Sequence, residues 1–227
     1  IRRSGFKLSL RKLVDGTYQL FGDHLPISDL SFLKGAPLSQ LILPGCKIED
    51  LAPIRGLPLK ELWLNGNPIS DLAPLRGSGM PIEKLGLSGG AFGDLTPLIG
   101  LPLKEIHLHR CPDVVDVAVL AQIPTLERIT VPALSKNIES LQNLPRLQLL
   151  SFSLTESSPW IPDTTAEDFW KEWPKHGWLH ALHQTGFKPK VLGRLPDRTW
   201  EVDLDNTAIR DLSILAGAPI SRLGLQG

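Results

Sequence analysis

Three histidines have the spacing that could best support chemistry in this chain. His176, His180 and His183 occupy positions i, i+4 and i+7, which share one face of a continuous helix. Three imidazole nitrogens gathered in this way could bind zinc. Pro174 and Gly177 interrupt the same segment, and both residue types disfavour a continuous helix. We therefore favour packed or solvated histidines and keep a zinc site as the alternative.

The remaining candidates for chemistry are weaker. His107 and His109 share one side of an expected strand, but the sequence places no third metal ligand beside them. The Gly-rich segment 86–93 contains Gly86-Leu87-Ser88-Gly89-Gly90, but we interpret it as a turn of the repeat and not as a strand-to-helix elbow that would hold a catalytic serine. Neither Cys46 nor Cys111 is placed for nucleophilic attack. We expect no catalytic residue, no metal and no cofactor in this chain.

The elements that position these residues come from a short repeat. Segments such as Ile69-Ser70-Asp71-Leu72 recur along the chain, and successive aspartates in the first five copies are 21, 21, 23 and 22 residues apart. A periodicity of this length is typical of solenoid proteins. The repeated aspartates are Asp29, Asp50, Asp71, Asp94, Asp116 and Asp211.

A second pattern lies between these aspartates and defines the fold class. Segment 59–69 has the form Leu-x-x-Leu-x-Leu-x-x-Asn-x-Ile, and seven successive units match it. The pattern is identified as a leucine-rich repeat. Alternating leucines make a short strand with one apolar side, which only neighbouring units can bury. The sequence predicts an α/β solenoid, with a curved parallel sheet, short convex helical turns and an interrupting helical spacer.

The turn residues and the cysteines fit this solenoid. Proline follows the Asp-Leu-x step at Pro53 and Pro74, where a helix begins, so we expect the aspartate or its preceding serine to cap each turn. Cys46 and Cys111 replace the asparagine of the repeat three units apart, or about 14 Å across the sheet. A disulfide needs a separation below about 7 Å, so we expect free buried thiols. This favours a reducing compartment and otherwise leaves localisation open.

The repeat fails after Phe152, where a different composition begins. Residues 164–167 resemble a capping box, and aromatic residues at helical spacing follow them, which predicts a pair of helices. The beginning of the chain then recurs with an offset of 182 residues, so we expect a fragment of a longer protein built on a super-repeat. The predicted segments are the end of a preceding spacer at 1–12, a block of about seven repeats at 13–154, a helical Trp/His-rich spacer at 155–192, and the start of a second block at 193–227.

Two resemblances follow from these motifs. The repeat at Ile69 to Leu87 resembles the short bacterial leucine-rich repeats, including those of internalin-like surface proteins. The spacer segment 163–172, followed by Leu195-Pro196-Asp197-x-Thr199-Trp200, resembles the leucine-rich tail regions of large bacterial serine/threonine kinases. The chain contains none of the kinase catalytic motifs, so the resemblance implies a kinase only elsewhere in a longer protein.

Charge and hydropathy exclude two classes of partner. The 24 Lys and Arg residues balance 24 Asp and Glu residues, so no basic field attracts nucleic acid. No apolar run approaches the roughly 20 residues that span a bilayer, so we expect no membrane insertion by this chain. A protein or peptide is the expected partner.

The concave side of the predicted sheet is the candidate binding face. The residue between the two inward apolar positions of each strand gives a column that begins with Phe21, Ile42 and Trp63, followed by smaller or polar residues. Large apolar side chains in such a row are typical of binding hot spots. Residues 1–12 packing over Phe21 and Ile42 is an equally weighted alternative, which makes Trp63 the best candidate. The predicted partner-binding residues are Phe21, Ile42, Trp63, Lys84, His107 and Arg110.

The sequence predicts a non-catalytic protein-interaction module within a larger bacterial regulatory protein. An exported, internalin-like adhesion or host-binding domain is the alternative. A kinase domain upstream would favour the first interpretation, and a secretion leader or wall anchor would favour the second.

Overall fold

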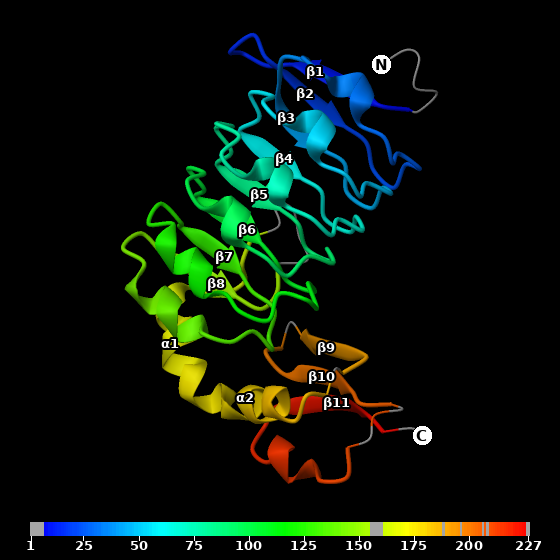
Figure 1. Ribbon diagram of the computed structural model, residues 1–227. Coiled ribbons are helices and arrows are strands. Elements are labelled where there is room, and N and C mark those ends of the chain that lie inside the picture. The colour runs from blue at the N-terminus through cyan, green and yellow to red at the C-terminus, as the bar shows by residue number, and fades with distance from the viewer. Residues whose placement is uncertain are drawn as a thin grey trace.

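Eight short strands stack side by side into one curved sheet (Figure 1). The computed structural model describes residues 7–154, 161–187, 189–195, 197–205, 207 and 209–225. The first pair of strands is antiparallel and every later pair is parallel. The strands, in sheet order, are β1 (Ser9–Lys12), β2 (Tyr18–Phe21), β3 (Leu38–Ile42), β4 (Glu61–Trp63), β5 (Lys84–Gly86), β6 (Glu105–His107), β7 (Arg128–Thr130) and β8 (Leu149–Ser151).

A ladder of fully buried aliphatic residues runs through the middle of the sheet. Each parallel pair from β2 to β8 is in a register that sets the central apolar residue of one strand against that of the next. Burying such a side chain contributes about 1.5–3 kcal/mol, which is available only because a neighbouring repeat covers it. The predicted solenoid is therefore confirmed. The ladder consists of Leu20, Leu41, Leu62, Leu85, Ile106, Ile129 and Leu150.

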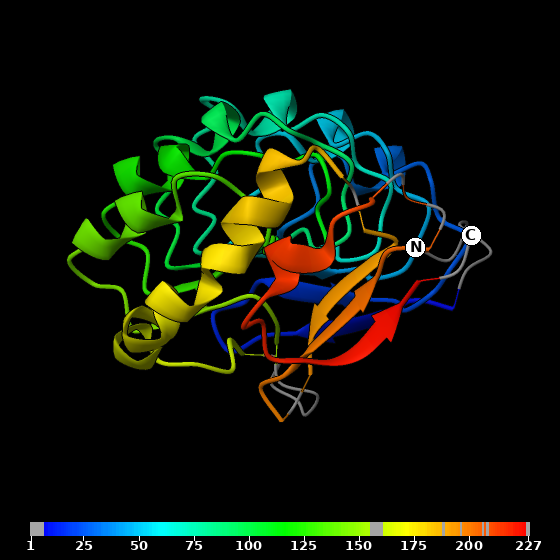
Figure 2. The ribbon, with the colours of Figure 1, turned by 90° about the horizontal axis from the view of Figure 1, so that it is seen from below.

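Short 3₁₀ turns form the convex side, in a row opposite the strands (Figures 1 and 2). A proline lies at the start of three of them, at Pro53, Pro74 and Pro97, where its missing N–H costs little. The turns are η1 (Ser31–Leu33), η2 (Ala52–Ile54), η3 (Ala73–Leu75), η4 (Thr96–Leu98), η5 (Ala118–Gln122) and η6 (Ile138–Asn143).

The repeated aspartates cap these turns. The Oδ1 atom of Asp71 accepts a hydrogen bond from the backbone N–H of Ala73 at 2.7 Å, and Asp29, Asp50, Asp94 and Asp116 make the equivalent bond at 2.7–2.8 Å. The prediction that the aspartate or its neighbouring serine caps the turn is confirmed for the aspartate.

The asparagine position of the repeat points into the interior. The Nδ2 atom of Asn67 donates to the carbonyl oxygens of Leu43 and Leu64 at 2.8 and 2.9 Å. Cys46 and Cys111 occupy the same position as free, buried thiols, as predicted. The Sγ atom of Cys111 donates to Leu87 O at 3.3 Å, and burial raises the pKa of this thiol to about 11.

Two helices joined by a 3₁₀ turn form the spacer, as predicted. These are α1 (Ala166–Glu172), η7 (Trp173–His176) and α2 (Gly177–Gln184). Thr165 caps α1, because its Oγ1 accepts from Asp168 N at 3.1 Å. No helix in the described parts of the chain has both the length and the apolar composition needed to cross a membrane.

A separate three-stranded sheet follows the spacer and lies at the lower end of the stack in Figure 1. Its strands are β9 (Val191–Arg194), β10 (Trp200–Asp203) and β11 (Ile220–Gly224), with the turn η8 (Leu212–Leu215) before β11. Strands β9 and β10 are antiparallel, whereas β10 and β11 are parallel. The antiparallel strand that opens each sheet, β1 or β9, carries no repeat motif and was not predicted from the sequence.

Candidate functional site

The predicted concave column exists as a row of residues in register. Phe21 pairs with Ile42, Ile42 with Trp63 and Trp63 with Gly86, and the pairing continues strand by strand. Because side chains alternate along a strand, this row lies on the side opposite the buried ladder. The central column comprises Phe21, Ile42, Trp63, Gly86, His107, Thr130 and Ser151.

Exposure divides the central column into two parts. Phe21 is 44% exposed, and Ile42 and Trp63 are half-buried. His107, Thr130 and Ser151, in contrast, are fully buried. The apolar surface available to a partner is therefore the N-terminal part of the column.

Trp63 is held by residues of two neighbouring strands. Its Nε1 atom donates to Glu61 Oε2 at 3.3 Å, which fixes the polar edge of the indole. The ring lies over Gly86, where an added Cβ would be only 2.5 Å from Trp63 Cε3. Beyond Gly86, the indole meets the His107 ring at a centroid distance of 5.1 Å and an interplanar angle of 63°. A glycine at position 86 is thus required for this orientation of Trp63.

Paired charges run along the same face beside the central column. Lys84 Nζ donates to Glu61 Oε1 at 3.2 Å, and Arg128 Nη1 donates to Glu105 Oε2 at 3.4 Å. The other carboxylate oxygen of Glu105 lies 2.9 Å from His107 Nε2. These pairs neutralise the face locally, so it has no strong charge of either sign.

Glu105 is the most buried carboxylate on this face, and its side chain is 6% exposed. Burial raises its pKa, but the contact with His107 and the charges of Arg128 and Lys84 outweigh burial, so the pKa lies below its ordinary value. Glu105 is therefore ionised at neutral pH. The Nδ1 atom of His107 is buried without a hydrogen-bond partner among the described residues.

His109 lies two residues after His107, in the turn that follows β6. Burial, together with the smaller effects of the nearby His107 and Arg110, lowers its pKa to about 4. Its Nδ1 atom is 2.7 Å from Ser88 Oγ. His109 is thus neutral at pH 7, and its contact with Ser88 fixes the orientation of the ring.

The six predicted partner-binding residues do not all lie on one exposed surface. Phe21, Ile42 and Trp63 lie in adjacent register positions, and Lys84 lies beside them in its pair with Glu61. His107 has no exposed surface, so a partner cannot touch it; its ring instead packs against the indole of Trp63. Arg110 lies in the turn after β6, where it is exposed and has a φ of 59°.

Residues 9–12 lie beside Phe21 and leave it exposed. Strand β1 pairs edge to edge with β2, with Ser9 opposite Phe21. The alternative in which residues 1–12 pack over Phe21 and Ile42 is therefore wrong for residues 9–12 and Phe21, while residues 1–6 lie outside the described part of the chain.

The three spacer histidines are not brought together as ligands. His176 is buried and stacked on Phe169, with its Nδ1 3.0 Å from Glu172 O, whereas His180 is exposed and contacts Gln184. Within the described parts of the chain, no group of three or more His, Cys, Asp or Glu side chains could hold a metal ion.

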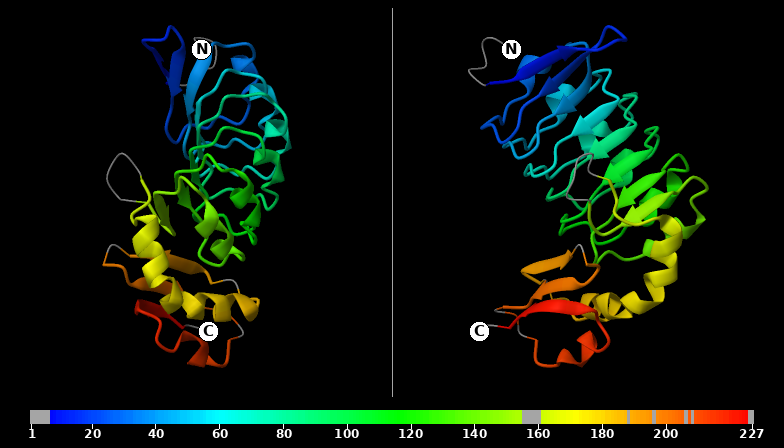
Figure 3. Two further views of the ribbon diagram at one scale, coloured as in Figure 1. Left: turned by 90° about the vertical axis from the view of Figure 1, so that its left-hand side faces the viewer. Right: turned by 180° about the vertical axis from the view of Figure 1, so that it is seen from behind.

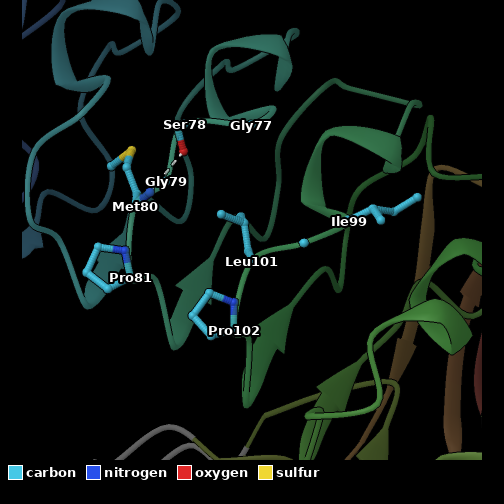
Figure 4. Close-up of a pocket in the computed structure, with 9 residues that line it drawn as sticks. Gly77, Ser78, Gly79, Met80, Pro81, Ile99, Leu101 and Pro102 are labelled. Atoms are coloured by element: carbon cyan, nitrogen blue, oxygen red, sulfur yellow. Dashed lines mark hydrogen bonds between the residues drawn. The ribbon is translucent and has the colours of Figure 1, made fainter.

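A groove lies between two turns and was not predicted from the sequence (Figure 4). It has a volume of about 350 Å³ and forms where segment 77–81 is two residues longer than its counterpart in the preceding repeat. The unequal aspartate spacing was the available signal. The lining contains no titratable side chain and consists of Gly77, Ser78, Gly79, Met80, Pro81, Ile99, Gly100, Leu101 and Pro102.

Comparison with known proteins relates the chain to solved structures only. No protein-family model and no curated protein sequence matches the chain. An internalin (inlF) of Listeria monocytogenes matches over 88% of this chain and 51% of its own, with 22% identity and a TM-score of 0.50. Internalin C2 of the same species matches over 55% of this chain and 66% of its own, with 22% identity and a TM-score of 0.40.

The chain spans about half the length of the first of these internalins. At 22% identity the likeness concerns the fold. It agrees with the register of the buried ladder, the row of 3₁₀ turns and the aspartate caps. The chain is a leucine-rich-repeat solenoid.

Proposed function

We propose that this chain is a non-catalytic protein-interaction module that binds a protein or peptide on its concave face. The observation that carries the proposal is the row of Phe21, Ile42 and Trp63, which presents large apolar side chains on a sheet surface. Aromatic residues contribute most of the energy at many interfaces, because they bury a large area at a small cost in side-chain entropy.

The fixed orientation of Trp63 strengthens this proposal. Glu61, Gly86 and His107 hold the indole from three sides before any partner arrives. A partner that packs on Trp63 therefore loses little free energy to ordering the ring. The paired Glu61 and Lys84 form a polar rim, which excludes water from the contact.

The paired charges also define the chemistry of the partner. Because Lys84 is neutralised by Glu61 and Arg128 by Glu105, a strongly acidic or basic partner gains little from this face. A segment with apolar or aromatic side chains fits the row of Phe21, Ile42 and Trp63 best.

We further propose a larger bacterial regulatory protein as the setting of this module. The spacer motif suggests a serine/threonine kinase, and an exported adhesion of internalin type is the alternative. The coding sequence on either side of the chain distinguishes them, through a kinase domain in one case and a secretion leader or wall anchor in the other.

A peptide-display selection on the full chain tests the binding face. Peptides selected on the wild-type chain should bind Trp63→Ala about tenfold or more weakly, with an unchanged circular-dichroism spectrum. Ile99→Ala is the matched control, because Ile99 is an exposed aliphatic residue on the groove between two turns. Peptides that retain full affinity for Trp63→Ala but lose it for Ile99→Ala would contradict the proposal.

A further inference from the structure

The two sheets begin with the same three-stranded unit. Strands β9, β10 and β11 start and end 182 residues after β1, β2 and β3 respectively, and the pairing registers have the same offset. Single contacts are also repeated. The Oγ atoms of Thr17 and Ser39 are 2.6 Å apart, and those of Thr199 and Ser221 are also 2.6 Å apart.

In the second block, the spacer helices cover the side of this unit that carries Trp200. Trp200 of β10 is 1% exposed, and its ring lies 5.3 Å from that of Trp178 and 5.4 Å from that of Phe152. Both views of Figure 3 show the helices against this small sheet. The unit is thus closed by an aromatic cluster that includes α2 and the end of the first block.

An ion pair fixes the same contact. The Nη2 atom of Arg194 donates to Glu172 Oε2 at 2.6 Å, and the Arg194 side chain is 3% exposed. Its Nη1 atom also donates to Thr164 Oγ1 at 3.4 Å. Exposed Arg198 binds the second oxygen of Glu172 at 3.2 Å. Glu172 of α1 therefore holds the opening unit of the second block through two guanidinium groups.

The first block presents equivalent residues without this cover. Tyr18 corresponds to Trp200 and is half-buried, while Lys12 corresponds to Arg194 and is exposed. Leu10, which corresponds to half-buried Leu192, is 47% exposed. Lys12 makes no ion pair with any residue that the structure describes. An aromatic ring, a cation and a leucine thus recur on one side of the opening unit.

We propose that Leu10, Lys12 and Tyr18 form a docking face for an aromatic, acidic helical segment of the kind that residues 163–184 form. A glutamate at the position of Glu172 would pair with Lys12. Aromatic rings in the places of His176 and Trp178, which lie 6.1 and 5.3 Å from the ring of Trp200, would cover Tyr18. This face lies at the end of the first block and is distinct from the concave face, so its occupant is a different partner.

The helices of a second copy of this chain are not the proposed occupant. In each copy, Glu172 and Trp178 are already engaged by Arg194 and Trp200. A second copy would have to release its own second block, and the buried side chains of Arg194 and Trp200 would then lose their contacts. The occupant is therefore a free segment with this composition.

Tyr18 is the single tyrosine of the chain and supplies a specific probe. The full chain, labelled with 3-fluorotyrosine, gives one ¹⁹F resonance at the proposed face. Titration with a synthetic peptide of residues 161–187 should shift this resonance in a saturable way. The same peptide carrying Glu172→Lys should bind about tenfold or more weakly, and Lys12→Glu in the chain should restore its binding.

Three results would overturn the proposal. The first is the absence of a shift at millimolar peptide. The second is an equal shift with the Glu172→Lys peptide, which would mean that the ion pair is not used. The third is a shift that depends on protein concentration without peptide, which would identify a second copy as the occupant. Arg194 stays unchanged throughout, so the second block remains docked on its own spacer.

Discussion

The indole of Trp63 reaches across Gly86, and its ring centroid lies 5.1 Å from that of the buried His107 ring. Three consecutive strands, β4, β5 and β6, therefore cooperate to present one side chain. This arrangement links the packing of the concave face to its proposed binding role, because residues that a partner cannot touch determine where Trp63 points.

Replacing Gly86 with alanine should displace Trp63. The new methyl group would lie 2.5 Å from Trp63 Cε3, so the indole must move. We expect a loss of about 1–3 kcal/mol in the free energy of unfolding, together with a shift of the Trp63 indole N–H signal in an NMR spectrum. Gly193→Ala is the control, since a Cβ there meets nothing within 4 Å. Equal effects of the two substitutions would contradict the role assigned to Gly86.

Glu105 should make stability depend on pH in the acidic range. Its pKa is lowered in the folded chain, so its contribution is fully present above the ordinary value of about 4.5 and is lost as pH falls through the folded value. We expect Glu105→Gln to lower the free energy of unfolding by about 1–3 kcal/mol at pH 7. The deficit should shrink below about pH 4.5 in urea titrations. A deficit that stays constant down to pH 3 would show that ionisation of Glu105 is unimportant.

The thiol of Cys111 should be inert in the folded chain. Burial raises its pKa to about 11, and burial also raises the pKa of Cys46. Because only the thiolate reacts, iodoacetamide at pH 8 should modify neither cysteine until urea unfolds the chain. Mass spectrometry of tryptic peptides measures the modification at each site. Rapid labelling of Cys111 without denaturant would mean that this repeat opens locally.

Asp71 should contribute to stability through its cap. Its carboxylate satisfies the N–H of Ala73, so Asp71→Ala should cost about 0.5–2 kcal/mol in thermal unfolding. Ser70→Ala is the matched control, because Ser70 is the exposed neighbour that was the alternative cap. If the serine substitution costs as much as the aspartate substitution, the cap does not act through the Asp71 carboxylate.

The sequence predicted the fold because its signal is periodic. The spacing of residues such as Leu41 and Leu62 determines strand, register and buried side together, and each further repeat strengthens the inference. Strand β1 was not predicted, because a single antiparallel strand has no copy nearby in the sequence. Its counterpart β9, 182 residues away, was recognisable only as part of a longer duplication.

The candidate site was predicted in part, for a related reason. Alternation along a strand correctly placed Trp63 and His107 on one side of the sheet, because it depends only on local geometry. The burial of His107 depends on which residues cover the concave side of the sheet at that position, and the periodicity of the sequence does not identify those residues. The supporting role of Gly86 likewise could not be predicted, because it depends on the contact between Trp63 and His107, which belong to different repeats and meet across Gly86.

The spacer has a consequence for valency. Among the described residues, β1–β8 and β9–β11 form two sheets that share no strand pairing, with α1 and α2 between them. Because the sheets are separate, a contact along one sheet does not continue through strand pairing onto the other. A ligand with two linked binding motifs, one for each sheet, would form its second contact at the high effective concentration set by the linker. The spacing of the two motifs would then help to select such a ligand, in addition to the chemistry of each motif.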